Sequence, residues 1–464
     1  MKYIITTLGC KVNQYETQAM ETILNEHGHE PAAPGELADA VIVNTCAVTA
    51  ESGRKSRQLI RRLHGENPGA VLAVCGCYSQ IEPEAAAELG AQVIFGAADR
   101  AKLVEAVEKA VASGEGCRDI DEPFKRRAME HLPAGAVSGR TRAMLKIQDG
   151  CVNFCTYCII PYTRGRLCSL PVEDAARETA RLDAKGFREL VLTGIEVASY
   201  GVDLPGRPGL ADVICACAEA APDMRIRLSS LEPTVITEEF CRRLAGTKKL
   251  CRHFHLSLQS GCDKTLKAMN RKYDTAQFYH ATELLREYFP GCALTCDLIT
   301  GFPGETEEDH AATLEFIRRC AFSDMHIFPY SRRPGTPADK MPGQCQRAVK
   351  ERRAHEAKLI AQEMKRAFLD ASVGAVLPVP MAQVSLITSS SAPAKEQTDR
   401  TSIRASTRDA SFFISEPPFI LLLQQRMAVI IGVAYPFTAP IVRPEMKYFW
   451  KKGYEQAIGM TPTM

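Results

Sequence analysis

Three cysteines near the middle of the chain have the type and spacing of a metal centre. Cys151, Cys155 and Cys158 follow one another at C-x3-C-x2-C spacing. Three thiolates so close together can hold three corners of a four-iron cluster. The fourth iron then lacks a protein ligand, so it can chelate a small molecule through an amino group and a carboxylate. The alternatives are buried cysteines or zinc, which usually takes four ligands. Cys168 would complete a zinc site only awkwardly, because it lies beyond Pro161.

A second set of three cysteines comes from residues that are far apart in the sequence. Cys10, Cys46 and Cys77 each follow a predicted strand within residues 1–125. In a parallel, doubly wound sheet the carboxyl ends of the strands share one edge, where ligands bind. Three thiolates there again suit a cluster with one open iron, although cysteines at strand ends are often just buried. Cys75 could replace Cys77, but it ends an apolar run and is expected to point into the core.

Strands and helices alternate through residues 1–125, which predicts a parallel, doubly wound sheet. The expected strands are 3–7, 40–44, 70–74 and 92–95, and the expected helices are 14–27, 54–64, 83–89 and 100–113. Residues 114–138 are polar and lack periodicity, so this stretch is interpreted as a linker, with the domain boundary at 125.

Residues 139–370 repeat the order strand, loop, helix. Six strands are expected, at 144–147, 189–192, 225–228, 253–258, 293–298 and 326–329, each followed by polar residues. This predicts an incomplete (β/α)6 barrel with its active site at the carboxyl-terminal rim. The three-cysteine loop follows the first strand and so lies on that rim. A charged amphipathic helix at 350–369 would pack on the barrel exterior or contact RNA.

The composition fits a globular protein of two or three domains. The chain has 464 residues, 45% of them hydrophobic, and a net charge of +2 that indicates no particular partner. No secretory leader is visible, so the 18 cysteines indicate metal or catalytic thiols, and we expect a cytoplasmic protein. The apolar stretch at 419–435 is interrupted by Gln424, Gln425 and Arg426 and is too short to span a membrane.

The cysteine motifs resemble those of radical S-adenosylmethionine (SAM) methylthiotransferases, and most closely the tRNA threonylcarbamoyladenosine branch. The C-x3-C-x2-C spacing, with Tyr157 before its last cysteine, is the radical SAM signature. The resemblance spans residues 2–375. Its motifs are TLGCKVN at 7–13, NTCAVT at 44–49, GCY at 76–78, LKIQDGC at 145–151, HLSLQSG at 255–261, MNRKY at 269–273 and GFPGET at 301–306. Lys11–Asn13 resembles the threonylcarbamoyl branch more than the isopentenyl one.

The resemblance implies SAM and two [4Fe–4S] clusters as cofactors. The C-x3-C-x2-C cysteines would hold the SAM cluster, and Cys10, Cys46 and Cys77 an auxiliary cluster that delivers sulfur. In the implied reaction, one electron cleaves SAM to methionine and a 5′-deoxyadenosyl radical, which abstracts the hydrogen on C2 of an adenine. Sulfur bonds to that carbon, and a second SAM supplies the methyl group. An aromatic C–H of this kind has no acidic proton, so the cofactor carries the chemistry.

Several residues at the barrel rim are candidates for SAM contacts. Gly194 permits close approach of the backbone to an adenosine, and Gly301–Gly304 is a rigid turn. Taken alone, each is better explained as a structural turn. Glu232 and Asp297 can bind the ribose or the amino group, or instead cap a helix or pair with an arginine. The full set of candidates is Gly194, Glu196, Glu232, Gln259, Asp297, Gly301 and Pro303.

The implied substrate is N6-threonylcarbamoyladenosine at position 37, in the anticodon loop of ANN-decoding tRNA. The reaction also implies an electron donor such as flavodoxin or ferredoxin, a sulfur source, and no membrane partner. Alternatives are methylthiolation of isopentenyladenosine in tRNA or of a ribosomal protein aspartate, and a non-enzymatic iron–sulfur carrier. A predicted helix presents a basic face that would attract RNA phosphates or simply be solvated. Its residues are Arg54, Lys55, Arg57, Arg61 and Arg62.

The chain departs from the family pattern after residue 370. The family ends in a small RNA-binding β-barrel, the TRAM domain, and only Ser372–Pro378 resembles its opening strand. Residues 384–411 are rich in Ser and Thr and are predicted to be disordered. Residues 412–464 lack the alternation and glycine turns of a barrel. We therefore expect an N-terminal methylthiotransferase domain at 1–125, a linker at 126–138, a radical SAM domain at 139–370, and a divergent tail at 371–464 in which the TRAM-like barrel is missing or disrupted.

Overall fold

In the computed structural model, which describes residues 1–133, 142–247 and 249–374, the N-terminal part of the chain builds a six-stranded sheet. Its strands are β1 (Lys2–Thr7), β2 (Glu30–Pro31), β3 (Ala40–Thr45), β4 (Val71–Gly76), β5 (Val93–Phe95) and β6 (Cys117–Asp119). They are ordered β2-β1-β3-β4-β5-β6, and every pair is parallel. The order reverses between β1 and β3, which is the switch point where ligands bind in such sheets. The predicted doubly wound sheet is confirmed.

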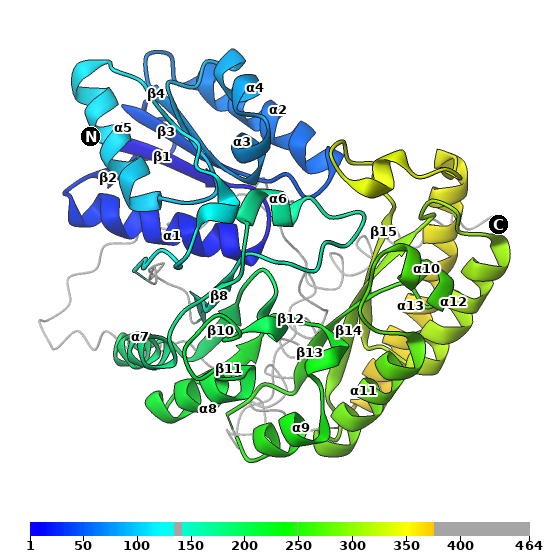
Figure 1. Cartoon of the computed structure of the whole chain (residues 1–464). Coiled ribbons are helices and arrows are strands. Elements are labelled where there is room, and N and C mark those ends of the chain that lie inside the picture. Colours follow the sequence, from blue (N-terminus) through cyan, green and yellow to red (C-terminus); the bar gives the residue numbers. More distant parts are fainter. Residues whose placement is uncertain (134–141, 248, 375–464) are drawn as a thin grey trace, which may run out of the picture. The chain divides into compact units, whose positions relative to one another are not determined.

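Helices cover both faces of this sheet (Figure 1). They are α1 (Lys11–Glu26), α2 (Ala50–Glu66), α3 (Cys77–Ile81), α4 (Pro83–Glu88) and α5 (Arg100–Ser113). Alternate residues of each strand supply the two layers. Ala40 and Ile42 of β3 pack with apolar residues of α1 and α5, whereas Val41 and Val43 pack with those of α2, α3 and α4.

Three local expectations in this region are wrong. The stretch 114–138 contains β6, which pairs with β5, so its first residues belong to the sheet. The edge strand escaped detection because Cys117, Arg118 and Asp119 are polar and mostly exposed. Helix α1 begins at Lys11 rather than Gln14, because Cys10 already adopts the N-cap conformation. Cys77 begins α3 instead of lying in a turn.

The second half of the chain forms the predicted incomplete barrel. Its strands are β7 (Arg142–Lys146), β10 (Glu189–Thr193), β11 (Arg225–Leu228), β12 (Ser230–Leu231), β13 (His253–Gln259), β14 (Ala293–Thr300) and β15 (Asp324–Pro329). They form parallel sheets of order β11-β10-β7 and β12-β13-β14-β15. Only Ser229 separates β11 from β12, and Ile226 bridges to Leu250. The two sheets are therefore six successive strands of one partial barrel.

Helices lie outside the barrel strands and complete its core (Figure 1). They are α7 (Val172–Ala184), α8 (Leu210–Ala220), α9 (Glu238–Ala245), α10 (Asp263–Ala268), α11 (Thr275–Tyr288), α12 (Glu307–Cys320) and α13 (Arg347–Ala371). Helix α13, predicted at 350–369, packs on β15 and buries Ala354, Ala357 and Ile360. Short elements complete the rim: α6 (Ile160–Arg164), the antiparallel pair β8 (Gln148–Asp149) and β9 (Cys168–Ser169), and 3-10 turns η1 (Pro123–Lys125), η2 (Val197–Ser199), η3 (Pro233–Val235) and η4 (Pro337–Lys340).

Several expectations concern residues that lie outside the described ranges. These are the missing or disrupted TRAM-like barrel, most of Ser372–Pro378, the disordered stretch 384–411, and the apolar stretch 419–435 within 412–464. Within the ranges described, no helix combines the length and apolar character that crossing a bilayer requires.

Candidate active site

The first cysteine set converges at the switch-point edge of the N-terminal sheet. Cys10 follows β1 and caps α1, Cys46 follows β3, and Cys77 follows β4. Because β1, β3 and β4 are neighbours in the sheet, the three side chains come together. Burial raises the pKa of both Cys10 and Cys46, and the nearby Cys77 side chain adds to this rise. The structure thus brings together three residues that the sequence separates by 36 and 31 positions.

Two glycines let the ends of these strands approach one another. Gly76, at φ 103°, precedes Cys77, and a Cβ there would lie 2.4 Å from the Thr45 carbonyl oxygen. Gly9, at φ 114°, precedes Cys10, and a Cβ there would lie 2.9 Å from the Cβ of Cys46. Both positions need positive φ and have no room for a side chain. Each glycine therefore helps to set how closely the cysteines gather.

Cys75, the alternative third ligand, lies elsewhere. It is fully buried in β4 and belongs to the apolar cluster with Tyr3 and Met20, on the sheet face that α1 and α5 cover. Cys77 belongs to the cluster of the opposite face, with Tyr78. The expected inward orientation of Cys75 agrees with this placement, which favours Cys77 as the third member of the set.

Desolvation by the surrounding protein raises the pKa of Cys10 and Cys46 in one set and of Cys151 and Cys158 in the other. The pKa of Cys10 rises to about 11, and those of Cys151 and Cys158 rise to about 12. Cys10 is nonetheless solvent-accessible, and Cys151 and Cys158 are partly so. Iron would have to displace the thiol protons, since the thiolate is the ligand form. Thiols that are surrounded by protein but still reached by solvent are suited to bind a cofactor that is inserted from solution.

Among residues 1–133, 142–247 and 249–374, no group of three or more His, Cys, Asp or Glu side chains is arranged to hold a single metal ion.

The C-x3-C-x2-C loop is held by the segment that follows α10. The Thr156 amide donates to the Met269 carbonyl at 3.0 Å, and the Thr156 hydroxyl donates to the Ala268 carbonyl at 2.9 Å. The Asn270 amide group donates to the Phe154 carbonyl at 2.9 Å. Phe154 and Asn270 both have positive φ, 47° and 58°. The MNRKY motif therefore clamps the cysteine loop, a role that the sequence alone did not reveal.

Arg271 connects this loop to the rim of the barrel. Its Nη1 donates to the Cys155 sulfur at 3.2 Å, and its Nη2 lies 2.8 Å from Glu232 Oε1. The guanidinium is 5% exposed, so its charge is weakly screened. Glu232, a candidate SAM contact, is thus engaged by Arg271, as the structural alternative allowed, and also accepts from Asn153 at 3.1 Å.

Two other carboxylate candidates lie near the same loop or in the barrel interior. Glu196 is buried, and its carboxylate accepts from the Ala198 amide at 3.1 Å and from the Ser199 hydroxyl. Burial raises its pKa, and the charge of nearby Glu232 raises it further. The charge of Glu196 also raises the pKa of Cys151. Asp297 pairs instead with His255 at 3.2 Å.

The remaining SAM candidates have mainly structural surroundings. A Cβ on Gly194 would lie 2.9 Å from the Gln148 carbonyl oxygen, so this glycine admits the protein's own backbone. Gly301 packs against Lys350 of α13, and its amide donates to Glu305 at 3.1 Å. Pro303 is buried in the same turn. Gln259 differs: it has φ 64° at the end of β13, a conformation that is uncommon for a side-chain-bearing residue and is worth notice at a rim position.

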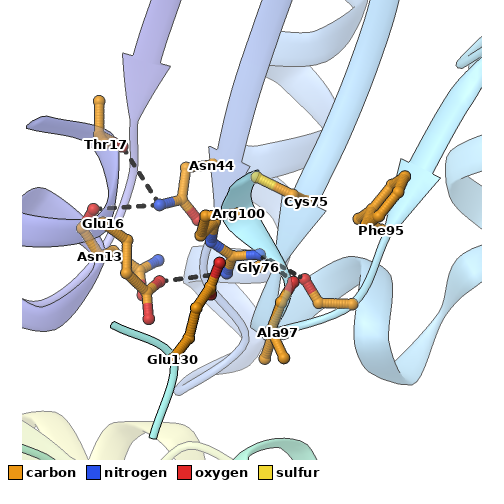
Figure 2. Close-up of polar contacts among 12 residues, drawn as sticks. Asn13, Glu16, Thr17, Asn44, Cys75, Gly76, Phe95, Ala97, Arg100 and Glu130 are labelled. Carbon is orange, nitrogen blue, oxygen red and sulfur yellow. Dashed lines mark hydrogen bonds and ion pairs between the residues drawn. The ribbon is translucent and has the colours of Figure 1, made fainter. Parts of the chain in front are cut away.

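A buried charge network joins the two cysteine segments. Figure 2 shows its contact between Glu16 and Arg100. Glu16 of α1 lies 3.1 Å from Arg100 and 3.0 Å from Lys146, and it also pairs with Arg164, which lies six residues after Cys158. Each of these side chains is at most 3% exposed. Arg164 also donates to Asn13 at 2.8 Å. The signal in the sequence was a glutamate on the apolar face of a predicted helix, but Glu16 was not among the predicted site residues.

The two cysteine sets lie close enough to interact. The charge of Cys77 raises the pKa of Cys158, and Ile159, next to Cys158, packs in the same apolar cluster as Cys77 and Tyr78.

Comparison with known proteins agrees with the arrangement. The family model for the Radical SAM superfamily matches residues 145–317, and that for Uncharacterized protein family UPF0004 matches residues 2–96. The chain is 39% identical over 375 residues to threonylcarbamoyladenosine tRNA methylthiotransferase MtaB of Bacillus subtilis, covering 80% of this chain and 83% of that protein. It is 36% identical to the MtaB of Thermotoga maritima, covering 78% and 82%.

A relative whose name gives a different substrate is almost as similar. The tRNA-2-methylthio-N(6)-dimethylallyladenosine synthase of Carboxydothermus hydrogenoformans is 36% identical, covering 76% of this chain and 82% of that protein. Among solved structures, the radical SAM methyltransferase TsrM of Kitasatospora setae superposes with a TM-score of 0.53 at 17% identity, covering 73% of this chain and 76% of that one. At that identity the likeness supports the fold alone.

Proposed function

Because the chain belongs to the methylthiotransferase family of radical SAM enzymes, we propose that it methylthiolates tRNA. Its substrate is N6-threonylcarbamoyladenosine at position 37, and the product is the 2-methylthio derivative. The observation that carries the proposal is the pair of adjacent three-cysteine sets, one on each domain, in a chain whose similarity to MtaB enzymes covers about 80% of its length. A non-enzymatic iron–sulfur carrier would not need the barrel rim.

As a family member the protein uses SAM and two [4Fe–4S] clusters. We assign the SAM cluster to Cys151, Cys155 and Cys158, and the auxiliary cluster to the cysteines that follow β1, β3 and β4. We retain the rim residues named above as candidate SAM contacts. Among them, the surroundings of Glu196 and Gln259 favour this role most. We also propose the domain limits 1–125, 139–370 and 371–464.

When bound, these groups supply the radical that removes the C2 hydrogen of the adenine, the sulfur that replaces it and the methyl group. The chain's own residues position and enclose them. Arg271 orients Cys155 and Glu232 through direct contacts, and the clamp at 268–270 fixes the loop that carries Cys155. The Glu16 network holds that loop against the domain that carries Cys10. These contacts serve the positioning and exclusion of water that radical chemistry needs.

The partners follow from the same chemistry. tRNA is the substrate, and the basic face of α2, which exposes Arg54, Lys55, Arg61 and Arg62, is suited to its phosphates. A one-electron donor such as flavodoxin or ferredoxin and a source of sulfur complete the set. These partners, like reduced clusters, belong in the cytoplasm.

Nucleoside mass spectrometry tests the proposal. The full chain is expressed in cells that lack this tRNA methylthiolation, and their tRNA is digested. We expect 2-methylthio-N6-threonylcarbamoyladenosine to form with the native chain and with Cys168→Ala, whose buried cysteine lies outside both sets, but not with Cys151→Ala. If the native chain instead produced only the 2-methylthio derivative of isopentenyladenosine, or cleaved SAM without modifying tRNA, the assigned substrate would be wrong.

A further inference from the structure

Three aromatic side chains form an exposed group at the C-x3-C-x2-C loop. Phe124 comes from η1, Phe154 from the loop itself, directly before Cys155, and Tyr162 from α6. The rings of Phe124 and Phe154 are nearly parallel, with an angle of 10° between their planes and centroids 6.2 Å apart. Tyr162 meets Phe154 edge-on, with centroids 5.9 Å apart. We call Phe124, Phe154 and Tyr162 the aromatic patch.

The rings of the aromatic patch face solvent, although aromatic side chains are mostly buried. Their exposed fractions are 38%, 39% and 40%, and Val152 of the same loop is 44% exposed. In the part of the chain that the structure describes, only one other Phe, Tyr or Trp side chain, Phe328 of β15, is exposed to this degree. Single exposed apolar residues need no explanation, but a group of them in mutual contact indicates an interaction surface.

The backbone that carries the aromatic patch is fixed by close contacts. Gly165, at the end of α6, has no room for a side chain, because a Cβ there would lie 2.0 Å from the Pro123 carbonyl oxygen. The segment η1 therefore packs directly on α6. Phe154 has φ 47°, and its carbonyl accepts from the side-chain amide of Asn270 at 2.9 Å. Positive φ is uncommon in a bulky residue and is found most often at functional sites.

Two exposed cations border the aromatic patch. Lys272 donates to the side chain of Asn270 at 3.0 Å, and the same side chain contacts the Phe154 carbonyl. Arg127 donates to the Phe124 carbonyl at 2.9 Å. Within the described ranges, neither Lys272 nor Arg127 forms an ion pair with a carboxylate. Both charges are therefore available to an anionic ligand that lies on the patch.

Exposed aromatic faces bordered by such cations match the chemistry of single-stranded RNA. Bases of an unpaired loop stack on aromatic side chains, while basic side chains bind the phosphates between them. The carboxylate of Glu122, two residues before Phe124, does not repel these phosphates strongly, because it pairs with Lys125 at 2.6 Å. The location favours the same ligand. The adenine that reacts must come to the cysteine loop, and its neighbours in the strand are covalently attached to it.

We propose that the aromatic patch stacks on a base next to the modified adenosine in the anticodon loop, with Arg127 and Lys272 on the adjoining phosphates. This inference rests on the proposed function and deepens it, because it assigns the surface that holds the unpaired strand beside the SAM cluster. Stacking on an aromatic ring tolerates any base, so the patch positions the strand without reading its sequence. An electron donor must also approach this loop, but its docking does not call for parallel aromatic faces.

Binding of two anticodon stem-loops to the reconstituted full-length protein tests this assignment. Both carry N6-threonylcarbamoyladenosine at position 37, and one lacks the bases at positions 36 and 38 but keeps their sugars and phosphates. We expect the native protein to bind the intact loop about tenfold more tightly, which is the size of one base–aromatic stack. Iron content, measured in every protein, should stay at the native level, because the substituted residues lie outside the cysteine loop.

The variants identify which rings provide this preference. Phe124→Leu and Tyr162→Leu should each reduce the preference for the intact loop to less than about threefold, because leucine offers no aromatic face. Phe124→Tyr should keep the native preference. Tyr288→Leu, at the end of the outer helix α11, is the matched control for Tyr162→Leu and should keep it as well.

The remaining outcomes each decide the question. Equal affinity of the native protein for the two RNAs would overturn the proposal without any variant. Unchanged RNA binding in both leucine variants would overturn it too. If these variants then cleaved SAM more slowly with flavodoxin but not with dithionite as the reductant, the patch would be a docking surface for the electron donor. If the native protein formed no methylthio product on either RNA or on tRNA, the proposed function would fail, while the affinities would still decide whether the patch stacks on bases.

Discussion

Cys75 and Cys77 are two residues apart, yet they serve different parts of the molecule. Cys75 sits on β4 within an apolar cluster, while Cys77 begins α3 at the edge where Cys10 and Cys46 also lie. Gly76 makes the difference possible, since its positive φ turns the chain at the end of the strand. Of the two thiols, only that of Cys77 lies where it can bind the same cluster as Cys10 and Cys46.

Iron analysis of anaerobically reconstituted protein should separate the two residues. Cys77→Ala should lose about half of the bound iron and acid-labile sulfide, because one of two clusters loses a ligand. Cys75→Ala is the matched control and should keep both, because it only shortens a buried side chain. Full iron content in Cys77→Ala, with loss in Cys75→Ala, would reverse the assignment.

At the scale of elements, α1 carries a charge on the face it buries. Glu16 is 1% exposed between Arg100, Lys146 and Arg164, and these cations hold its pKa well below the usual value. A buried ion pair adds little net stability, but removing one partner leaves the others uncompensated. The helix is therefore tied to α5, β7 and α6 by one carboxylate.

We expect Glu16→Gln to lower the free energy of unfolding by about 3–5 kcal/mol, because three buried cations would lose a shared counter-charge and the remaining carboxylate, Asp149, pairs only with Lys146 and Arg164. Urea unfolding followed by circular dichroism measures the change. Glu51→Gln is the matched control, since Glu51 pairs with Arg54 on the exposed surface, and it should unfold at the native midpoint. Similar midpoints for both variants would show that the network contributes nothing to stability.

Element types were predictable where a short-range pattern carries them. The short apolar runs of β3 and β4, which are buried along their whole length, and the amphipathic helices predicted the sheet, and six strand–helix units predicted the barrel. Strand β6 was not predictable. Its polar, mostly exposed residues carry no apolar pattern, and they form a strand only because they pair with β5. Likewise the cysteine motifs pointed to both cysteine sets, but no local pattern shows that Arg271 reaches Cys155, 116 residues earlier. Gly194 is the opposite case. It was predicted as a SAM contact, but the close approach of Gln148 already requires a glycine at this position.

At the scale of the whole molecule, all the candidate site residues lie in one compact unit, residues 1–387. Both cysteine sets, the clamp at 268–270 and the Glu16 network are formed by contacts inside it. The charges and hydrogen bonds that position them come from elements between β1 and α13. The chemistry with SAM should therefore depend on this unit.

A chain that ends at residue 387 should bind as much iron as the full chain and cleave SAM at the same rate in the absence of RNA. Chromatographic measurement of 5′-deoxyadenosine from both proteins checks this, with Cys151→Ala in the shortened chain as the blank. Loss of SAM cleavage, in a shortened protein that still holds its iron, would mean that residues 388–464 contribute to the reaction.

The contact between Arg164 and Glu16 has a consequence for how such proteins can diversify. Arg164 belongs to the barrel and Glu16 to the N-terminal domain. Both side chains are buried, so water does not stabilise either charge. Grafting either half onto a foreign partner would leave Glu16 with Arg100 alone and Arg164 with Asp149 alone. Exchange of halves between distant relatives should therefore be rare, and the two parts should be inherited together, with any change at one position answered at the other.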